Sequence, residues 1–411
     1  MTFENARSGA RPDDMQTSPV KVAIIGVGGG GSNAVDNMIT AGVKVDQFMA
    51  INTDRQALRV SKAKKRVQIG SNITGGFGAG ADPESGRKSA EECREPLTAL
   101  IKDMDLVFIT AGMGGGTGTG AAPVIAEIAH TMGKLVIAFV TTPFMFEGEP
   151  RMRNAMGGIA RLREHVDSII IVPNERLTSV AKDMTTQAAF KYADDILRQG
   201  VQATTDLIAN PGRINVDFAD IRAVLKNGGD AIMGIGRASG TNRALEAVKR
   251  AVNNAVLGTT IEGASRAIVN IEGKEIKMDE VNQAAALVKE ICAKDANIIF
   301  GTAIVPTLQD EMQVTIIATG FVKPNGAGQP QQQSGLQPNR PQQSFGGMYG
   351  QGMPQQGMGM NNQNPYYRPQ QTEYRSQPQP QPQQPNRAPG NGFIGLDDDT
   401  DSAWLNKLRN K

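Results

Sequence analysis

The chain has 411 residues, of which 39% are apolar and 20% are charged, a balance typical of globular domains with real cores. Its formal net charge of +2 gives no whole-chain reason to expect a nucleic-acid partner. No apolar stretch approaches the roughly 20 residues of a membrane span, and the polar N-terminus lacks the apolar core of a signal peptide. The two cysteines stand far apart, so we expect a cytoplasmic protein with reduced thiols.

The first half of the chain alternates between strand-like and helix-like segments. We expect strands at residues 20–25, 45–51, 105–110, 135–141 and 168–172. We expect helices at residues 33–41, 84–102 and 151–165, and another after the glycine-rich segment that ends at residue 120. Alternation of this kind predicts a parallel sheet with helices on both faces. Ligands of such sheets bind at the carboxyl ends of the strands.

A long helical pattern follows at residues 186–209 and would span about 35 Å. A smaller α+β pattern comes next, with helices expected at 218–226, 241–256 and 279–293 and strands at 231–236, 266–271, 297–304 and 313–319. The predicted fold class is therefore α/β, with a Rossmann-like parallel-sheet nucleotide-binding domain, a long central helix and a smaller α+β second domain.

Composition changes abruptly near Gly320, where Gln-, Pro-, Gly- and Asn-rich sequence begins. Such sequence has too little apolar surface to offset the entropy of ordering, so we expect disorder. The last 15 residues differ again, because they hold the only tryptophan, Trp404, followed by Leu405. This pattern is typical of a partner-binding motif, and a solubilising tail is the alternative. The predicted division is an arm at 1–18, a nucleotide-binding domain at 19–185, the central helix at 186–212, the α+β domain at 213–320, a disordered linker at 321–396 and a tail peptide at 397–411.

The segment GGGTGTG, residues 114–120, stands between an expected strand and an expected helix. Without Cβ atoms, successive backbone N–H groups can point into one concavity. The start of the helix adds unpaired N–H groups and the positive end of its dipole. The segment therefore predicts an anion cradle, most simply for phosphate. The alternative is a tight turn, which would need only one or two glycines.

Two further glycine-rich loops follow nearby strands. One contains Gly26, Gly28 and Gly31 at the spacing of a dinucleotide fingerprint. Asp54 could then hold ribose hydroxyls, which leaves an NAD-dependent oxidoreductase open as an alternative. A third loop begins at Gly75, and three anion-binding loops around one site favour a nucleoside triphosphate.

The phosphate-binding chemistry expected here does not depend on a lysine. No P-loop motif occurs, and the segment at 114–120 contains no lysine. We therefore expect backbone N–H groups and the hydroxyls of Thr117 and Thr119 to hold the phosphates. A metal ion would carry the positive charge.

These motifs resemble the tubulin/FtsZ family. GGGTGTG is the tubulin-type signature, and GVGGGGSNAV, NTD, GAGADPE, FEG, VPN and NVDFAD narrow the resemblance to its FtsZ branch, the bacterial tubulin-like GTPases of cell division. The resemblance covers about residues 20–320. It implies GTP or GDP and Mg²⁺ as ligands, hydrolysis of GTP to GDP and phosphate, and head-to-tail polymerisation. It also implies location at the midcell division ring. No side chain is assigned as a metal ligand.

The resemblance also implies roles for individual residues. Those expected near the phosphates are Gly29, Gly30, Asn33, Ala79, Gly80, Gly114, Gly115, Gly116, Thr117 and Gly118. Glu147 and Arg151 match ribose contacts, and Phe190 and Asp194 match the residues that recognise guanine. A carboxylate can accept hydrogen bonds from guanine N1–H and from its exocyclic amine, whereas adenine offers no such pair. Asp195 stands beside Asp194, and the spacing of four residues from Phe190 favours Asp194. Core packing is the alternative role for Phe190.

The segment NVDFAD, residues 215–220, has two compatible interpretations. Asp217 is a good helix N-cap, with Asp220 three residues on. The family resemblance implies that this loop enters the nucleotide site of the next subunit. Asp217 and Asp220 would then help to polarise the attacking water, and Asn215 would contact the phosphate region. A scaffold that binds nucleotide without turnover is a further alternative, which these acids disfavour.

Three positions depart from the family pattern. Thr142 stands where a basic residue is frequent, so a surface or interface charge is missing. Asp82 replaces a frequent asparagine and adds a charge expected close to the metal. In the tail, residues 401–403 replace the usual aliphatic–proline pair before Trp404 and Leu405. The resemblance implies division-protein partners for this tail and membrane contact only indirectly, through a tethering partner.

Overall fold

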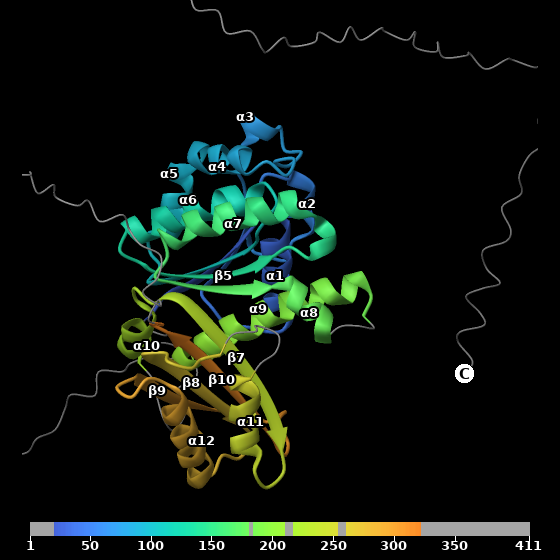
Figure 1. The fold of residues 1–411 in the computed structure, drawn as a ribbon. Helices are drawn as coiled ribbons and strands as arrows, with labels where there is room; N and C mark the ends of the chain where they lie inside the picture. Colours follow the sequence, from blue (N-terminus) through green and yellow to red (C-terminus); the bar gives the residue numbers. More distant parts are fainter. Residues whose placement is uncertain (1–19, 181–183, 210–216, 254–259, 322–411) are drawn as a thin grey trace, which may run out of the picture. The chain divides into compact units, whose positions relative to one another are not determined.

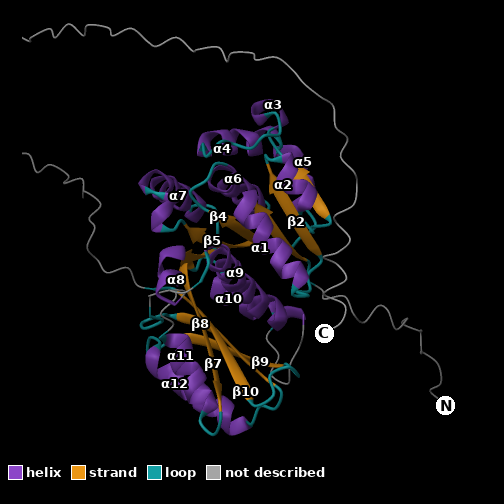
Figure 2. Cartoon of the chain, turned by 90° about the vertical axis from the view of Figure 1, so that its right-hand side faces the viewer, coloured by secondary structure: helices purple, strands orange, loops and turns teal. Residues whose placement is uncertain are grey.

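The computed structural model describes residues 20–180, 184–209, 217–253 and 260–321, which belong to one compact unit. The expected N-terminal arm, almost all of the linker, the tail peptide and Asn215 lie outside these residues. No helix among the described residues is long and apolar enough to cross a membrane. Figures 1 and 2 show how the helices and strands are arranged.

In the described part of the chain the strands form one ten-stranded mixed sheet in the order β3-β2-β1-β4-β5-β6-β7-β10-β8-β9. The strands are β1 (Val22–Val27), β2 (Gln47–Asn52), β3 (Lys65–Gln68), β4 (Leu106–Gly112), β5 (Leu135–Thr142), β6 (Ser168–Pro173), β7 (Gly229–Ser239), β8 (Arg266–Gly273), β9 (Asn297–Ile304) and β10 (Glu311–Thr319). The strands from β3 to β6 are parallel, whereas β10 runs antiparallel to both β7 and β8. The two ends of the sheet are β3 and β9.

Helices connect most of these strands. They are α1 (Gly28–Thr40), α2 (Arg55–Val60), α3 (Ser71–Thr74), α4 (Pro83–Glu92), α5 (Arg94–Ile101), α6 (Thr117–Thr131), the 3₁₀ turn η2 (Met145–Glu147), α7 (Glu149–Arg163), α8 (Asn174–Val180), α9 (Thr186–Ala209), α10 (Phe218–Leu225), α11 (Arg243–Val252) and α12 (Met278–Ile291). The sequence predicted most of them, and α9 has the predicted limits.

The parallel part of the sheet is buried on both faces. Val22 and Ile24 of β1 pack with α1 and α9, whereas Ala23, Ile25 and Val27 pack with α5, α6 and α7. Figure 1 shows α6 and α7 on one side of β5 and α9 on the other. Because both faces are covered, β1 and β5 are buried along their whole length, as expected for parallel strands between helix layers. This confirms the predicted α/β class.

The second half of the described chain has its own core. Helices α11 and α12 lie together over one face of β7, β8 and β10, as Figure 2 shows. Strand β7 joins the two halves, since its first three residues pair with β6 in parallel and the rest pairs with β10. Asp167 supports this junction, because its carboxylate accepts hydrogen bonds from Val136 N at 2.9 Å and Asn227 N at 3.3 Å.

The sequence-based prediction was wrong where it placed one helix at residues 84–102. Two helices occupy this segment, and they meet at Cys93, whose φ of −106° and ψ of 20° are not helical. Pro96 explains the break, since it lacks the N–H that a continuous helix would need and its ring would collide with the preceding turn. The short elements α2, β3, α3, η2 and α8 were not predicted from the sequence.

Candidate functional site

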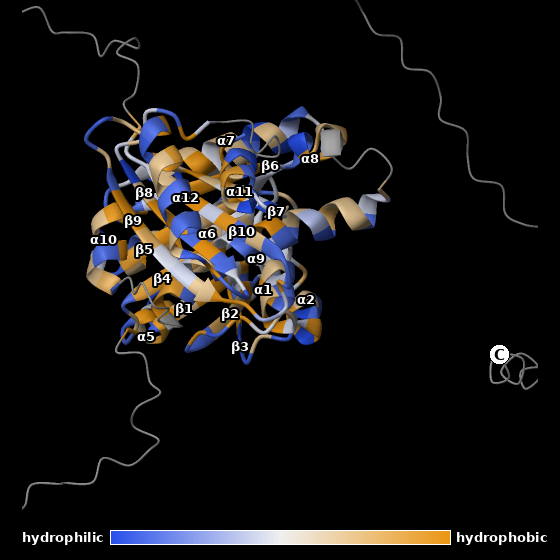
Figure 3. Cartoon of the chain, turned by 90° about the horizontal axis from the view of Figure 1, so that it is seen from below, coloured by the Kyte–Doolittle hydropathy of each residue, from blue (hydrophilic) through white to orange (hydrophobic). Residues whose placement is uncertain are grey.

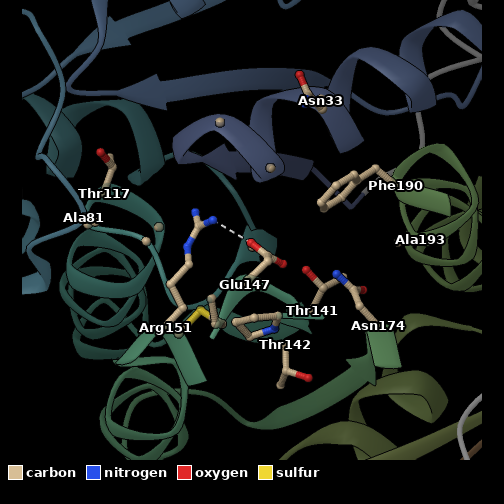
Figure 4. Close-up of a pocket in the computed structure, with 18 of the residues that line it drawn as sticks. Asn33, Ala81, Thr117, Thr141, Thr142, Glu147, Arg151, Asn174, Phe190 and Ala193 are labelled. Carbon is tan, nitrogen blue, oxygen red and sulfur yellow. Dashed lines mark hydrogen bonds and ion pairs between the residues drawn. The ribbon is translucent and has the colours of Figure 1, made fainter. Parts of the chain in front are cut away.

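The fold places a crevice between β1 and β4. These strands are neighbours in the sheet, but the chain leaves β1 for α1 on one face and β4 for α6 on the other. In open parallel sheets such a reversal of direction opens a ligand-binding crevice at the carboxyl ends of the strands. A cavity of about 640 Å³ lies there, and Figure 4 shows some of the residues that line it.

Glycines allow α1 to begin directly at the end of β1. A Cβ on Gly26 would lie 2.3 Å from Gly31 O, and one on Gly31 would lie 2.3 Å from Thr110 O. The helix therefore starts at Gly28, five residues before the predicted start, and the expected phosphate loop is its first turn. Gly29 and Gly30 of this turn line the cavity, so unpaired N–H groups at a helix start are available to an anion.

The loop between β4 and α6 is held by its own hydrogen bonds. Gly114 has a φ of +109°, and its N–H donates to Thr119 Oγ1 at 2.7 Å. Thr119 is fully buried, so the structure corrects the expectation that its hydroxyl holds phosphate: it closes the loop instead. Thr117 lines the cavity at the first turn of α6 and shares a 2.6 Å hydrogen bond with Thr53 Oγ1.

The third glycine-rich loop closes over this cradle. Ala79 and Ala81 line the cavity, and a Cβ on Gly116 would lie 2.7 Å from Ala79 Cβ. Asp82 follows as the N-cap of α4 and accepts hydrogen bonds from Ser85 Oγ at 2.6 Å and from Glu84 N at 3.0 Å. These bonds hold the pKa of the Asp82 carboxyl below its usual value. The Asp82 carboxylate is therefore engaged in capping α4.

Glu147 and Arg151 form an ion pair at the cavity wall. Arg151 Nη1 lies 2.6 Å from Glu147 Oε2, and Figure 4 marks this contact. The other carboxylate oxygen of Glu147 accepts from Phe144 N at 3.0 Å. Among the described residues that line the cavity, Arg151 is the only cationic one. The site therefore offers little side-chain positive charge to a polyphosphate.

The other end of the cavity is aromatic. Phe190 is 40% exposed and lines the cavity, so core packing is not its main role. Its ring meets Phe144 edge-on at a centroid distance of 5.0 Å and Phe146 at 6.4 Å. The exposed ring provides a flat apolar surface for a planar group.

Asp194 follows Phe190 by one helical turn and also lines the cavity. Burial raises the pKa of its carboxyl to about 7. Among the described residues it has no hydrogen-bond or ion-pair partner. A half-buried carboxylate without a partner is costly unless a ligand provides donors.

Sequence reasoning missed Asn174 and gave the wrong surroundings for Thr142. Asn174 is 4% exposed and lines the cavity, and its Oδ1 has no hydrogen-bond partner among the described residues. Thr142 is 7% exposed and lies in the cavity wall, not on an outer surface, as Figure 4 shows. The motif VPN, which ends at Asn174, was the available signal because it follows a strand in the parallel sheet.

The cavity brings together most of the residues expected to bind nucleotide. These are Gly29, Gly30, Asn33, Ala79, Gly115, Gly116, Thr117, Gly118, Glu147, Arg151, Phe190 and Asp194. Gly80 and Gly114 are not among its lining residues. The described residues contain no group of three or more His, Cys, Asp and Glu side chains that could hold a metal ion by themselves.

The expected catalytic acids lie outside this cavity. Asp217 is the N-cap of α10 and accepts from Asp220 N at 2.8 Å, as its capping role predicts. Asp220 is exposed in the first turn of the same helix. Ala209, at the end of α9, lies fifteen positions after Asp194, about 22 Å along a helix. Asp217 and Asp220 are therefore far along the chain from the end of the cavity where Phe190 and Asp194 lie.

Comparisons with known proteins agree with this architecture. A family model described as the GTPase domain of the tubulin/FtsZ family matches residues 21–182. A second, described as the C-terminal domain of the FtsZ family, matches residues 229–322.

Solved structures give the same result. FtsZ from M. jannaschii, in a structure described as an empty dimer, is 41% identical with a TM-score of 0.71, over 76% of this chain and 93% of that chain. A mutant of that FtsZ is also 41% identical, with a TM-score of 0.72 over 75% and 93% of the two chains. CetZ1 from Haloferax volcanii, a GDP-bound monomer, shares the fold at 24% identity, with a TM-score of 0.65 over 74% of this chain and 95% of that chain. By sequence, fold and cavity together, the chain belongs to the FtsZ family of tubulin-like GTPases.

Proposed function

We propose that this chain binds GTP in the cavity, hydrolyses it to GDP and phosphate, and polymerises head to tail into filaments of the bacterial division ring. One observation carries the proposal. A glycine-lined anion cradle shares one cavity with Asp194, a carboxylate that has no partner among the described residues. Family membership supports the same reading. The oxidoreductase alternative loses its candidate ribose ligand, because the Asp54 carboxylate caps α2.

Guanine recognition follows from the chemistry of the base end. Asp194 accepts hydrogen bonds from N1–H and the exocyclic amine of guanine while Phe190 packs against the ring. Adenine presents an unprotonated N1 where guanine presents a donor, so the same carboxylate would leave both acceptors unpaired. Buried polar groups left without partners are the usual source of such discrimination.

The phosphates would lie against the first turns of α1 and α6, where Gly29, Gly30 and Gly116 leave the backbone accessible. The only lining cation among the described residues, Arg151, is already paired with Glu147. This donor set fits a divalent cation bound mainly by phosphate oxygens and water, the usual manner of Mg²⁺. Mg²⁺ bound in this way would neutralise charge on the phosphates.

Catalysis is proposed to need a second subunit. Asp217, Asp220 and Asn215 would act on the nucleotide of the neighbouring copy, because their own cavity lies at the far end of α9. A contact between opposite ends of identical subunits is heterologous and builds open filaments. Among the relatives, M. jannaschii FtsZ is described as a dimer and CetZ2 from Haloferax volcanii as a GTPγS-bound protofilament. Intact acids at 217 and 220 favour turnover over passive nucleotide binding.

The remaining assignments belong to the same proposal. The chain would act in the cytoplasm at midcell, and the tail residues Trp404 and Leu405 would bind division proteins that tether filaments to the membrane. The division into domains at 19–185, 186–212 and 213–320, with a linker to 396, is proposed with it. A tail deletion that keeps GTP turnover but loses midcell recruitment would agree with these assignments.

The direct test measures light scattering and phosphate release after addition of GTP, ATP or NADH to the full chain. GTP alone should raise both signals, and specific activity should rise with protein concentration from near zero. Specific activity that stays constant on dilution would contradict catalysis between subunits. Equal turnover of ATP would contradict the assignment of the base site.

A further inference from the structure

The segment from α2 to β3 forms a strongly basic face. Residues 54–68 contain six basic side chains and one acid, Asp54. The basic residues are Arg55, Arg59, Lys62, Lys64, Lys65 and Arg66, and all six are exposed. We call these six residues the basic face. Figure 3 shows α2 and β3 next to one another at the edge of the protein.

The basic face is not neutralised within the described part of the chain. None of its six side chains forms an ion pair there. Two of the described acids form hydrogen bonds with this segment, but both bind backbone or hydroxyl groups and not its basic side chains. Asp54 caps α2, and Asp36 accepts from Ser61 Oγ and Lys62 N. Arg59, Lys64 and Lys65 have no side-chain hydrogen bond among the described residues. Six uncompensated cations on one segment produce a field that attracts an anionic partner.

The basic face also has apolar neighbours. Val60, the last residue of α2, is 79% exposed, and Phe77 is 90% exposed. Phe77 belongs to the same region, because Arg55 N donates to Gly76 O at 3.1 Å and Asp54 forms a β-bridge with Phe77. A partner that matches this surface would combine clustered acids with nearby apolar side chains.

The C-terminal end of the chain has this composition. Of the five acidic residues after position 321, four stand within Asp397–Asp401. Phe393, Ile394 and Leu396 come before them, and Trp404 and Leu405 come after. Three basic residues follow only at 407, 409 and 411. The segment 393–405 therefore complements the basic face in both charge and apolar content.

The connecting chain is long enough. Strand β10 lies seven strand positions from β3 in the sheet, which at about 4.8 Å per strand is about 34 Å. Seventy-five residues separate Phe321 from Asp397, and a coil of that length has a root-mean-square span of about 45–50 Å. The linker would hold the tail near the face at an effective concentration of about 1 mM. A contact of only millimolar affinity is then sufficient.

We propose that the basic face binds the acidic segment Asp397–Asp401 of the chain's own tail, in a salt-sensitive contact that places the neighbouring apolar residues against Val60 and Phe77. Exposed ion pairs are individually weak and screened by salt. The docked state therefore exchanges readily with the undocked one. Docking withholds Trp404 and Leu405 from other partners, so a tail-binding protein has to compete with the chain's own surface.

Trp404 provides a direct reporter, because it is the only tryptophan in the chain. Its fluorescence anisotropy is measured in the full chain at about 1 µM without nucleotide, at 50 and 500 mM salt. Docking predicts higher anisotropy at low salt. The triple variant Arg59→Glu, Lys64→Glu, Lys65→Glu should show the high-salt value at both concentrations. These three residues do not line the cavity, so phosphate release at high salt should stay unchanged.

A charge swap and a matched control complete the test. Adding Asp397→Lys, Asp398→Lys and Asp399→Lys to the triple variant should restore the anisotropy at low salt. The control reverses three exposed lysines of the other half, Lys274, Lys289 and Lys294, and should behave as the unmodified chain.

Two results would overturn the proposal. In the first, anisotropy at low salt is the same in the triple variant as in the unmodified chain. In the second, the control lowers it equally, which would show a general effect of net charge. Vesicles containing phosphatidylserine separate the other possible occupant. Suppose that the vesicles sediment the unmodified chain but not the triple variant, while the anisotropy of Trp404 at low salt is the same in both chains. In that case the basic face is a lipid-binding surface and the tail is not its partner.

Discussion

Asp194 and Asp195 are consecutive residues of α9 with opposite surroundings. Asp195 accepts from Arg198 Nε at 2.7 Å and from Gln199 Nε2 at 2.6 Å. Asp194 faces the cavity and has no partner among the described residues, and burial raises the pKa of its carboxyl to about 7. The sequence favoured Asp194 only by its spacing from Phe190. The hydrogen bonds now give a physical reason, because only Asp194 is free to bind a ligand.

Asp194→Asn should weaken GTP binding by roughly 10- to 100-fold, because it places an amide donor opposite the donors of guanine and loses a hydrogen-bonded pair worth about 1–3 kcal/mol. The preference for GTP over ATP should narrow. Asp195→Asn is the matched control and should leave nucleotide affinity nearly unchanged. Isothermal titration with both nucleotides measures this, and the reverse ranking of the two variants would assign the base contact to Asp195.

GTP affinity should increase with pH through about 7. The pKa of the Asp194 carboxyl in the nucleotide-free protein is raised to about 7 by burial, so below that pH the group is protonated and cannot accept both bonds. Binding therefore expels a proton, and affinity should rise up to tenfold per pH unit below 7 and level off above 8. Titrations from pH 6 to pH 8.5 test this, and Asp194→Asn should remove the dependence.

Gly116→Ala should impair nucleotide binding. Its Cβ would lie 2.7 Å from Ala79 Cβ and 2.9 Å from Asp82 O, so the loops of the cradle would have to move apart. Gly157→Ala is the control, because nothing lies within 4 Å of that position in α7. The control should bind GTP normally and gain about 0.5–1 kcal/mol of stability. Equal binding by both variants would show that the cradle tolerates the methyl group.

Much of the fold follows from local patterns that need no tertiary information. The sequence predicts β1 and β5 from their continuous apolar runs, and it predicts α9 from an apolar stripe that repeats over many residues. Pro96 is a sequence signal for the break between α4 and α5, because a proline cannot continue the preceding helical turn. The four residues of β3 could not be found, because a short strand with charged Lys65 and Arg66 has no apolar alternation.

In the candidate site too, local sequence patterns predict some features, whereas others depend on tertiary packing. The glycine spacing predicts the position of the cradle. It does not show that Thr119 Oγ1 accepts a hydrogen bond from Gly114 N, because that bond depends on how the loop closes. The buried Oδ1 of Asn174, which has no hydrogen-bond partner among the described residues, also depends on tertiary packing against residues distant in the sequence.

Asp220→Ala should bind GTP normally and hydrolyse it much more slowly, with filaments that persist. Asp220 is exposed and is not a cavity residue, and the N-cap of α10 is Asp217. The variant should therefore retain its fold, whereas Asp217→Ala would also lose a cap worth about 1 kcal/mol. Phosphate release and light scattering measure turnover and filament lifetime together.

A mixture of Asp220→Ala and Gly116→Ala separates action within a chain from action between chains. The first variant keeps a sound nucleotide site and the second keeps the acidic loop. Each should be nearly inactive alone, and a mixture should recover part of the turnover. A mixture that co-assembles without any recovery would count against a site shared by two subunits.

Glu272→Gln should stabilise the protein above pH 7. Burial, together with the nearby Asp206, raises the pKa of the Glu272 carboxyl to about 7, although Gln313 Nε2 donates to it at 2.6 Å. The folded state then holds an extra proton between about pH 4.5 and 7, so stability is lost as pH rises through that window. The variant should gain up to about 3 kcal/mol at pH 8 and little at pH 5. Urea unfolding at both pH values tests this, and equal gains would contradict it.

The two ends of the ten-stranded sheet are protected unequally. Strand β3 carries Lys65 and Arg66, and charges of this kind discourage a second molecule from adding a strand to an open edge. Strand β9 contains no charged residue, and Ile298, Ile299 and Phe300 are only half-buried. When the protein is refolded or stored at high concentration, insoluble material should therefore begin at β9. A lysine introduced there would improve recovery without touching the nucleotide cavity.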